Sequence, residues 1–182
     1  MILFLVLLAA LIVWGILIYN GLVGLRIRAD NAWSDISVQL NRRYDLIPNI
    51  VETVKGYAGH EEKVFRQVTE ARAKAMQAVN AGDKSSAEAA LSGALKSLLA
   101  VAENYPQLRA SENFGSLQAT LAEIEDALQS ARRYYNAVVR DYNIKTEVIP
   151  DRVIAGLAGF RGKEFFQLDS DAESKNPKVS FP

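Results

Sequence analysis

The densest group of side chains that could bind or react lies between Arg42 and Asn49. Two adjacent arginines open this segment, a tyrosine and an aspartate follow, and a proline precedes the final asparagine. Guanidinium groups form strong paired hydrogen bonds with carboxylates and with anionic ligands. An asparagine side chain can bond to a backbone carbonyl. The segment therefore suits either a bond network inside the protein or a surface that receives a ligand or partner.

Both interpretations of this segment make specific predictions. In the structural one, Arg42 or Arg43 pairs with a carboxylate on the long helix expected at 112–148, and Asn49 bonds to the carbonyl that Pro48 leaves free. Polar networks of this kind commonly fix the register between helices. In the functional one, the segment is a docking surface, and the tyrosine-rich end of the long helix faces it.

A second group of polar residues repeats at heptad spacing near the end of that long helix. Tyr135–Asn136 and Tyr142–Asn143 lie seven residues apart. A packed stripe explains the tyrosines but not the paired asparagines. The candidate residues for an interaction surface or polar network are Trp33, Asp35, Arg42, Arg43, Tyr44, Asp45, Pro48, Asn49, Tyr135, Asn136, Tyr142 and Asn143.

The residue types that most catalytic and metal sites need are scarce. The chain has one histidine, His60, and no cysteine. A di-metal helical bundle needs Glu-x-x-His pairs, but Tyr57 stands three residues before His60. The sequence also lacks a Gly-x-Ser-x-Gly elbow, a Gly-x-Gly-x-x-Gly run and a phosphate-binding P-loop. We expect no catalytic residue, metal or cofactor, and we predict that the protein is not an enzyme.

The charge balance bears on the class of partner. Lysines and arginines number 21 and acidic residues 21, so the formal net charge is zero. Nucleic-acid binders usually carry a basic excess or a basic stripe. The sequence shows neither, and we expect no nucleic-acid partner.

The first part of the chain is apolar. No charged side chain occurs from Met1 to Leu25, and Ile2 to Tyr19 is almost wholly hydrophobic. As a helix, residues 2–19 span about 27 Å, close to the hydrocarbon thickness of a bilayer. A cleaved signal peptide would have a basic start, a shorter apolar core and a small-residue cleavage site, and these are missing. We predict a retained single-pass anchor that contacts membrane lipid through residues 2–19.

Only two charges indicate on which side of the membrane the bulk of the chain lies. Arg26 and Arg28 are the first cations after the span, and Asp30 partly offsets them. Because cations near a span favour the cytoplasmic face, we place the bulk of the chain in the cytoplasm. The periplasmic or extracellular side stays open as the alternative.

The rest of the sequence has helical periodicity, with apolar residues three and four positions apart. One long helix is predicted to continue from the anchor, with a kink or a fresh start at Pro48. Further helices are predicted at 61–79, 85–104 and 112–148, and a short helical segment at 153–160. Asn80 to Asp83 reads as a turn, after which Ser85 and Glu88 form a capping box. Residues 107–111 read as a connector.

These patterns predict an all-α protein in which an N-terminal transmembrane helix is followed by an elongated antiparallel four-helix bundle. The helix predicted at 112–148 has an apolar heptad repeat typical of a coiled coil. We divide the chain into an anchor and juxtamembrane segment (1–25), a helical bundle (26–160), and a flexible or draped C-terminal tail (161–182).

Several short motifs resemble the bacterial LemA family across nearly the whole chain. They are Tyr19–Val23, Ala32–Asp35, Arg42–Val51, Val54–Ala58, Tyr105–Pro106, Glu112–Phe114, Ala131–Asn136 and Gly159–Phe160. The resemblance implies an anchored, elongated helical bundle in the bacterial inner membrane, without an established enzymatic reaction. It also implies kinship with proteins that help to form magnetosome membranes.

Taken together, the sequence predicts a non-enzymatic, membrane-anchored helical scaffold that recruits or organises protein partners, or associates with itself. Two alternatives belong to other classes. One is a ligand-sensing or small-molecule-binding bundle, in which the segment from Arg42 to Asn49 lines a pocket with Tyr135, Asn136 or Tyr142. The other is a self-assembling protein that shapes membranes.

Overall fold

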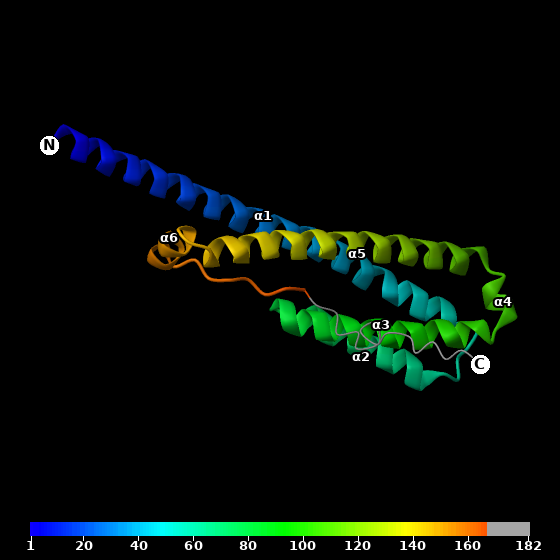
Figure 1. Ribbon diagram of the computed structural model, residues 1–182. Coiled ribbons are helices and arrows are strands. Elements are labelled where there is room, and N and C mark those ends of the chain that lie inside the picture. The colour runs from blue at the N-terminus through cyan, green and yellow to red at the C-terminus, as the bar shows by residue number, and fades with distance from the viewer. Residues whose placement is uncertain (167–182) are drawn as a thin grey trace, which may run out of the picture. The chain divides into compact units, whose positions relative to one another are not determined.

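The computed structural model describes residues 1–166, and within that range it contains helices and no strand. Figure 1 shows these elements along the chain. The all-α prediction is therefore confirmed. The helices are α1 (Ile2–Lys55), α2 (Glu62–Gln77), α3 (Ala81–Glu103), α4 (Pro106–Arg109), α5 (Glu112–Glu147) and α6 (Asp151–Ala158).

The chain forms two compact units, and the longest helices, α1 and α5, each contribute to both. The first unit contains Met1–Asn41 and residues 124–165. The second contains Arg42–Glu123 and Phe166. The segments predicted at 1–25, 26–160 and 161–182 were drawn from composition and stay a prediction. Of the expected tail, residues 167–182 lie outside the described residues.

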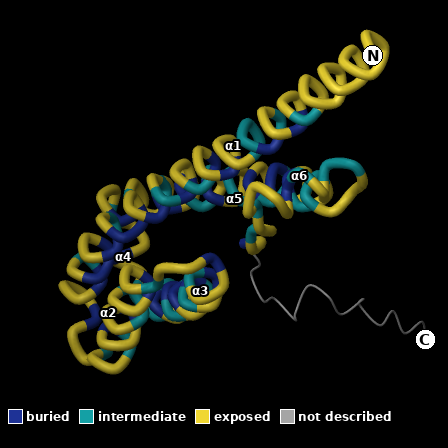
Figure 2. Tube along the Cα trace, turned by 90° about the vertical axis from the view of Figure 1, so that its left-hand side faces the viewer, coloured by how far each residue is buried: buried dark blue, intermediate teal, exposed yellow. Residues whose placement is uncertain are grey.

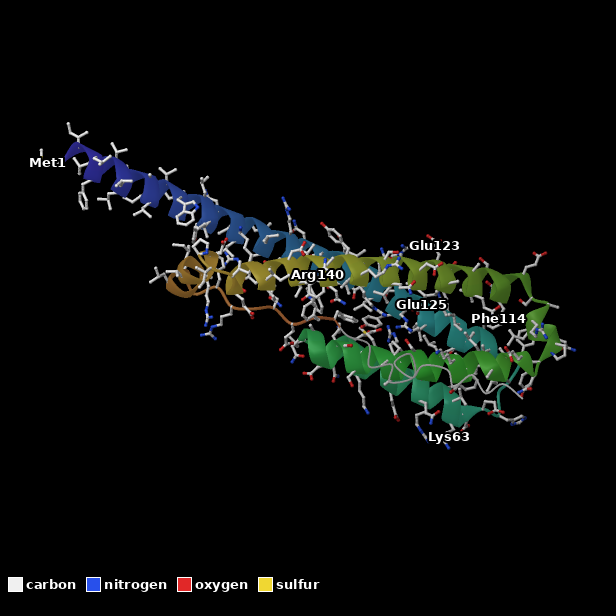
Figure 3. The ribbon with its side chains drawn as sticks, in the orientation of Figure 1. Met1, Lys63, Phe114, Glu123, Glu125 and Arg140 are labelled. Carbon is white, nitrogen blue, oxygen red and sulfur yellow. The ribbon has the colours of Figure 1, made fainter. Side chains whose placement is uncertain are left out.

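The apolar beginning of α1 has almost no protein packed around it. Its large side chains from Ile2 to Leu8 are between 45% and 77% exposed. Figure 2 shows this part of α1 as exposed, and Figure 3 shows its side chains projecting from the ribbon after Met1. Among residues 1–166, α1 is the one helix long and apolar enough to cross a membrane. Such a surface is unfavourable in water and suits contact with lipid.

Helix α1 does not restart at its proline. It continues through Pro48 to Lys55 and ends before a turn at Gly56 and Tyr57. The alternative of a fresh start at Pro48 is therefore wrong. A proline inside a helix removes one hydrogen bond, so another donor is expected for the carbonyl four residues earlier.

Helix α3 begins earlier than the sequence suggested. Asn80 adopts an extended conformation, and its side chain accepts a hydrogen bond from the backbone N–H of Asp83. It is therefore the N-cap of α3 rather than the start of a free turn. The capping box is wrong, because Ser85 and Glu88 lie inside the helix and are buried.

The remaining elements match the prediction in part. Helix α4 occupies part of the expected connector, and proline is its first residue. Helix α6 is followed by Gly159, which has a φ of 72° and ends the helix in the left-handed conformation. Most of the predicted stripe on α5 is buried: Leu121, Ile124, Leu128, Tyr135, Val138 and Tyr142.

Candidate functional site

A buried carboxylate lies at the centre of the polar residues of the second unit. Glu88 of α3 is fully buried. One of its oxygens accepts a hydrogen bond from the hydroxyl of Tyr44. The other is 2.7 Å from a terminal guanidinium nitrogen of Arg43. Two adjacent residues of α1 thus hold both oxygens of one carboxylate on α3.

The arginine of this pair is buried as deeply as the carboxylate. Arg43 is 1% exposed, and its second terminal nitrogen donates to the hydroxyl of Ser92 at 2.8 Å. Ser92 lies one helical turn after Glu88, so the guanidinium spans two successive turns of α3. A charge pair this deep is tolerable only when each charge is compensated and hydrogen-bonded.

The partner of Arg43 differs from the expected one. Its carboxylate partner Glu88 comes from α3, whereas the sequence predicted that either Arg42 or Arg43 would pair with the helix at 112–148. The neighbouring Arg42 does reach that helix, because one of its terminal nitrogens is 3.9 Å from a carboxylate oxygen of Glu123. Both side chains are exposed, and exposed pairs contribute little to stability. The strong contact is therefore the one to Glu88.

The hydrogen bond that Pro48 cannot form is supplied by α2. The missing N–H would have bonded to the carbonyl of Tyr44, four residues earlier. The Nε atom of Arg72 donates to that carbonyl at 2.8 Å. Asn49, which was expected to take this role, is exposed and not the donor found at this carbonyl. The proline is accommodated because Arg72, which is distant in sequence, supplies the donor.

The ring of Tyr44 also connects α1 with the end of α2. Its hydroxyl lies 3.3 Å from the carbonyl oxygen of Ala75. The ammonium of Lys84 donates to the carbonyls of Ala75 and Ala78 and lies 5.6 Å from the centre of the Tyr44 ring. The last carbonyls of a helix lack partners within the helix and attract cations. Lys84 therefore caps α2 while it contacts Tyr44.

In the first unit, an asparagine binds the segment that follows α6 through two hydrogen bonds. The side-chain amide of Asn143 donates to the carbonyl of Lys163 at 2.9 Å. Its side-chain oxygen accepts from the N–H of Lys163 at 2.8 Å. A Cβ added at Gly162 would lie 3.4 Å from the same oxygen. Asn143 thus holds an extended segment through both backbone groups of Lys163, a role that the heptad pattern did not suggest.

The same segment has two further attachments. The hydroxyl of Tyr135 donates to the carbonyl of Glu164 at 2.9 Å. The ammonium of Lys163 is 2.7 Å from a carboxylate oxygen of Asp30 on α1. The ring of Tyr135 lies 5.3 Å from that of Trp33, also on α1. The residues from Gly162 to Glu164 are therefore fastened to both α1 and α5 in this unit.

Both buried tyrosines of α5 resist ionisation. Burial raises the pKa of Tyr135, and the negative charges of Asp30 and Glu164 raise it further. Burial also raises the pKa of Tyr142, where Arg26 lowers it and Asp30 raises it to smaller extents. Both groups stay neutral at physiological pH, so they act as hydrogen-bonding and packing groups rather than as bases.

The twelve candidate residues fall into both units. Within the second unit, Arg43 and Tyr44 meet at Glu88, whereas Asp45, Pro48 and Asn49 are exposed. In the first unit, Trp33 contacts Tyr135. There Asp35 is exposed, Asn136 is half-buried and Tyr142 is buried. The predicted pairing of the arginine segment with the tyrosines of α5 stays a prediction.

The sequence patterns do not predict the partners that complete these networks. They predict a capping role for Glu88 and ordinary helix positions for Ser92 and Arg72. One signal was present for Glu88, because it lies three residues before Leu91 on the apolar stripe of α3. A charged residue on a buried stripe is expected to have a buried partner of opposite charge, because an unpaired charge in the interior is very unfavourable.

The networks connect helices within each unit. Within residues 1–166, no three His, Cys, Asp or Glu side chains are grouped to hold a metal ion. The carboxylate of Glu88 has an arginine and a tyrosine on its two oxygens. The arginine and tyrosine bound to Glu88 connect α1 with α3. Tyr44 and Arg72 connect α1 with α2.

Comparison with known proteins identifies the class of protein. The LemA family model matches residues 32–181, so the chain belongs to the LemA family. Three magnetosome proteins are among its relatives. MamQ 1 and MamQ 2 of Paramagnetospirillum magneticum are each 25% identical over 175 residues, and MamQ of Magnetospirillum gryphiswaldense is 24% identical over 174.

These alignments cover 81–82% of this chain but 64% of each relative, so the chain spans less than two thirds of their length. The family match begins at residue 32, after the apolar run of α1. Family membership and the exposed apolar helix together indicate a membrane-associated protein.

Proposed function

We propose that this LemA-family protein is a non-enzymatic, single-pass membrane scaffold that recruits or organises protein partners. The observation that carries the proposal is the use made of its most distinctive segment. Arg43 and Tyr44 bind Glu88 within the second unit, and Tyr44 also receives Arg72. Side chains that could have formed a reactive site instead fasten the helices of this unit together.

The ligand-binding alternative is less well supported. A ligand at Arg43 would have to displace both Glu88 and Ser92 from its guanidinium. Removing one partner of a buried ion pair is strongly unfavourable. An interaction role leaves this network in place, because a partner would contact exposed side chains of the helices.

Lysine-directed cross-linking with mass spectrometry in native membranes tests the scaffold proposal. Lys63 and Lys74 on α2 and Lys96 on α3 are exposed and available to the reagent, and Figure 3 labels Lys63. The control is residues 1–41 fused to an unrelated helical domain that carries lysines. We expect recurrent cross-links to a defined partner, or between copies, that the control lacks. Cross-links no more frequent or specific than those of the control would contradict the proposal.

We also propose that the bulk of the chain is cytoplasmic. Arg26 and Arg28 follow the apolar run, and cations in that position favour the cytoplasmic side. Because the chain has no cysteine, Val38→Cys introduces a single thiol at an exposed position. We expect a membrane-impermeant maleimide to label it only after spheroplasts are lysed. Equal labelling of intact spheroplasts would place the bulk of the chain outside.

A further inference from the structure

Helix α6 is apolar on two opposite faces. On its inner face, Ala155 is buried and Ile154 partly buried against Ile18 and Leu22 of α1. On its outer face, Val153 is 58% exposed and Leu157 83% exposed. Residues four apart lie on the same side of a helix, so these two form one patch. A helix that is apolar on both faces is expected to be covered on both.

The outer patch extends beyond the helix. Ile149, four positions before Val153, is 82% exposed, and Val148 beside it is 45% exposed. Val153 and Leu157 form what we call the α6 outer face, and Ile149 is a further exposed apolar residue in the turn before the helix. Side chains of this size are rarely left to water as a continuous group without a binding purpose.

The contacts of α6 show which part of the apolar run of α1 it lies beside. The Cδ1 atom of Ile154 lies 3.8 Å from the position that a Cβ on Gly15 would occupy. Gly15 is four residues inside the apolar run that ends at Tyr19, or about 6 Å along the helix axis. Interfacial helices bury their apolar faces about 5–10 Å into the boundary between headgroups and acyl chains. Helix α6 therefore lies beside the end of the apolar run, which is the depth of an interfacial helix when that run spans the bilayer.

Aromatic and charged groups at this level match a lipid interface. The rings of Tyr19 and Phe160 meet edge to face at 5.6 Å, and aromatic side chains favour headgroup depth. The guanidinium of Arg26 lies 5.3 Å from the centre of the Phe160 ring. These contacts connect the end of α6 to the first cation after the span.

The charges around α6 favour anionic lipid. Arg152 and Arg161 are exposed, whereas Asp151 is mostly buried and is 2.9 Å from the ammonium of Lys145. Glu147, at the end of α5, is an exposed acid in this region. Anionic headgroups attract exposed arginines near the membrane surface.

We propose that α6 is a second membrane contact, an interfacial helix whose outer face is inserted into the lipid beside the anchor. Lipid is the occupant because α6 packs against a turn of α1 that also exposes apolar side chains. On α1, Ile16 and Leu17 are exposed in the same turn whose Ile18 contacts α6. The inference requires the anchor to be in the bilayer, but it does not require a protein partner.

Depth-dependent quenching tests the proposal directly. The full chain carrying Leu157→Cys is labelled with the environment-sensitive dye NBD and placed in nanodiscs of phosphatidylethanolamine and phosphatidylglycerol, at one copy per disc. Spin-labelled lipids and aqueous iodide are the quenchers. The matched control is Val38→Cys, which is exposed on α1 in the same unit. With Trp33→Phe added to both labelled chains, quenching of Trp14 by brominated lipid verifies in the same discs that the anchor is inserted.

We expect the dye at position 157 to emit at shorter wavelength than at position 38. Lipids spin-labelled near the headgroup should quench it at least twofold, and iodide should have little effect. A second variant, Val153→Glu, should reverse these differences while Trp14 stays quenched. Iodide quenching at 157 equal to that at 38, with the anchor inserted, would overturn the proposal. So would a dye shielded from both quenchers, because protein would then cover this face.

Discussion

The buried pair of Arg43 and Glu88 affects the stability of the fold most strongly when one of its members is removed. Moving two charges from water into a protein interior is costly, and their mutual attraction offsets most of that cost. The pair therefore specifies which turn of α3 meets α1 more than it adds net stability. Removing one charge leaves the other buried with its main partner gone.

Replacing the carboxylate by an amide tests this interpretation. We expect Glu88→Gln to lower the free energy of unfolding by about 3–5 kcal/mol, because the charge of Arg43 stays buried without its counter-charge. Urea unfolding of the full chain in detergent, followed by circular dichroism, measures the loss.

The matched control removes both charges. Arg43→Met combined with Glu88→Leu should recover most of the stability, because apolar side chains of similar volume can replace a buried pair. The interpretation fails if Glu88→Gln costs less than about 1 kcal/mol, the range of an exposed pair.

The contact between Arg72 and the carbonyl of Tyr44 predicts coupling to Pro48. Arg72→Met should cost about 1–3 kcal/mol, because it leaves a partly buried carbonyl without its donor. In a Pro48→Ala background the N–H of the introduced alanine can bond to the same carbonyl, so the cost should fall by at least half. A double-mutant cycle measured by urea unfolding gives the coupling energy. Purely additive effects would show that Arg72 does not stand in for the missing N–H.

The tyrosines of α5 predict how stability depends on alkaline pH. Burial raises the pKa of Tyr135 and Tyr142 in the folded protein, whereas in the unfolded chain they ionise near pH 10, as free tyrosine does. Their contribution to stability is therefore complete below about pH 10 and is lost as the pH rises through the folded-state values. Unfolding measured from pH 8 to 12 should show this decline.

Replacing both tyrosines by phenylalanine separates this effect from lysine titration. The double variant should lose less stability between pH 10 and 12 than the natural chain does. Tyr134, which is exposed, provides the control, and Tyr134→Phe should leave the slope unchanged. Equal slopes in all three proteins would show that the buried tyrosines ionise normally.

Sequence patterns identified which residues matter better than they identified their partners. Arg43 and Tyr44 stood out because of their local density of polar groups. Their contacts, Glu88 and Arg72, lie 45 and 28 positions away, respectively. Periodicity gives the face of a helix, but it does not say which neighbouring helix meets that face or at which turn. For the same reason, the sequence did not predict that α2 would support Pro48.

Among the helices and their connections, the segment after α6 receives two of its hydrogen bonds from one side chain. Asn143→Ala removes both hydrogen bonds to Lys163 and should loosen the segment without unfolding α5. We expect amide hydrogen exchange at residues 160–166 to accelerate at least tenfold, while exchange at 124–142 changes little.

A second substitution at the same position checks the direction of each bond. Asn143→Asp keeps an acceptor for the N–H of Lys163 but cannot donate to the carbonyl of Lys163. Amide exchange at residues 160–166 should therefore be faster in this variant than in the natural chain and slower than in Asn143→Ala. Unchanged exchange in both variants would mean that Tyr135 and Asp30 alone hold the segment.

Helix positions were predictable where apolar spacing was regular and less so at their ends. The stripes of α2, α3 and α5 follow from their sequences. The start of α3 was missed because asparagine, glycine and aspartate occur both in turns and in N-caps. The early part of α6 was missed because Asp151 and Arg152 carry no apolar periodicity.

For the molecule as a whole, the two units share the α1 and α5 helices but differ in surroundings. The first unit carries the exposed apolar run and α6, and the second carries the buried network around Glu88. A membrane tether joined to an internally fastened helical unit suits a protein that holds partners near a bilayer. All of these roles require the beginning of α1 to lie in lipid.

Fluorescence quenching by brominated lipids tests that requirement most directly. The chain has two tryptophans, one inside the apolar run and one beyond it, so each can serve as the control for the other. Trp33→Phe leaves Trp14, inside the apolar run, and Trp14→Phe leaves Trp33, about 21 Å beyond Tyr19 along the helix. In reconstituted vesicles, we predict that bromines deep in the acyl chains quench Trp14 strongly and leave Trp33 unchanged. Emission from Trp14 that is insensitive to brominated lipid and quenched by aqueous iodide would contradict the account.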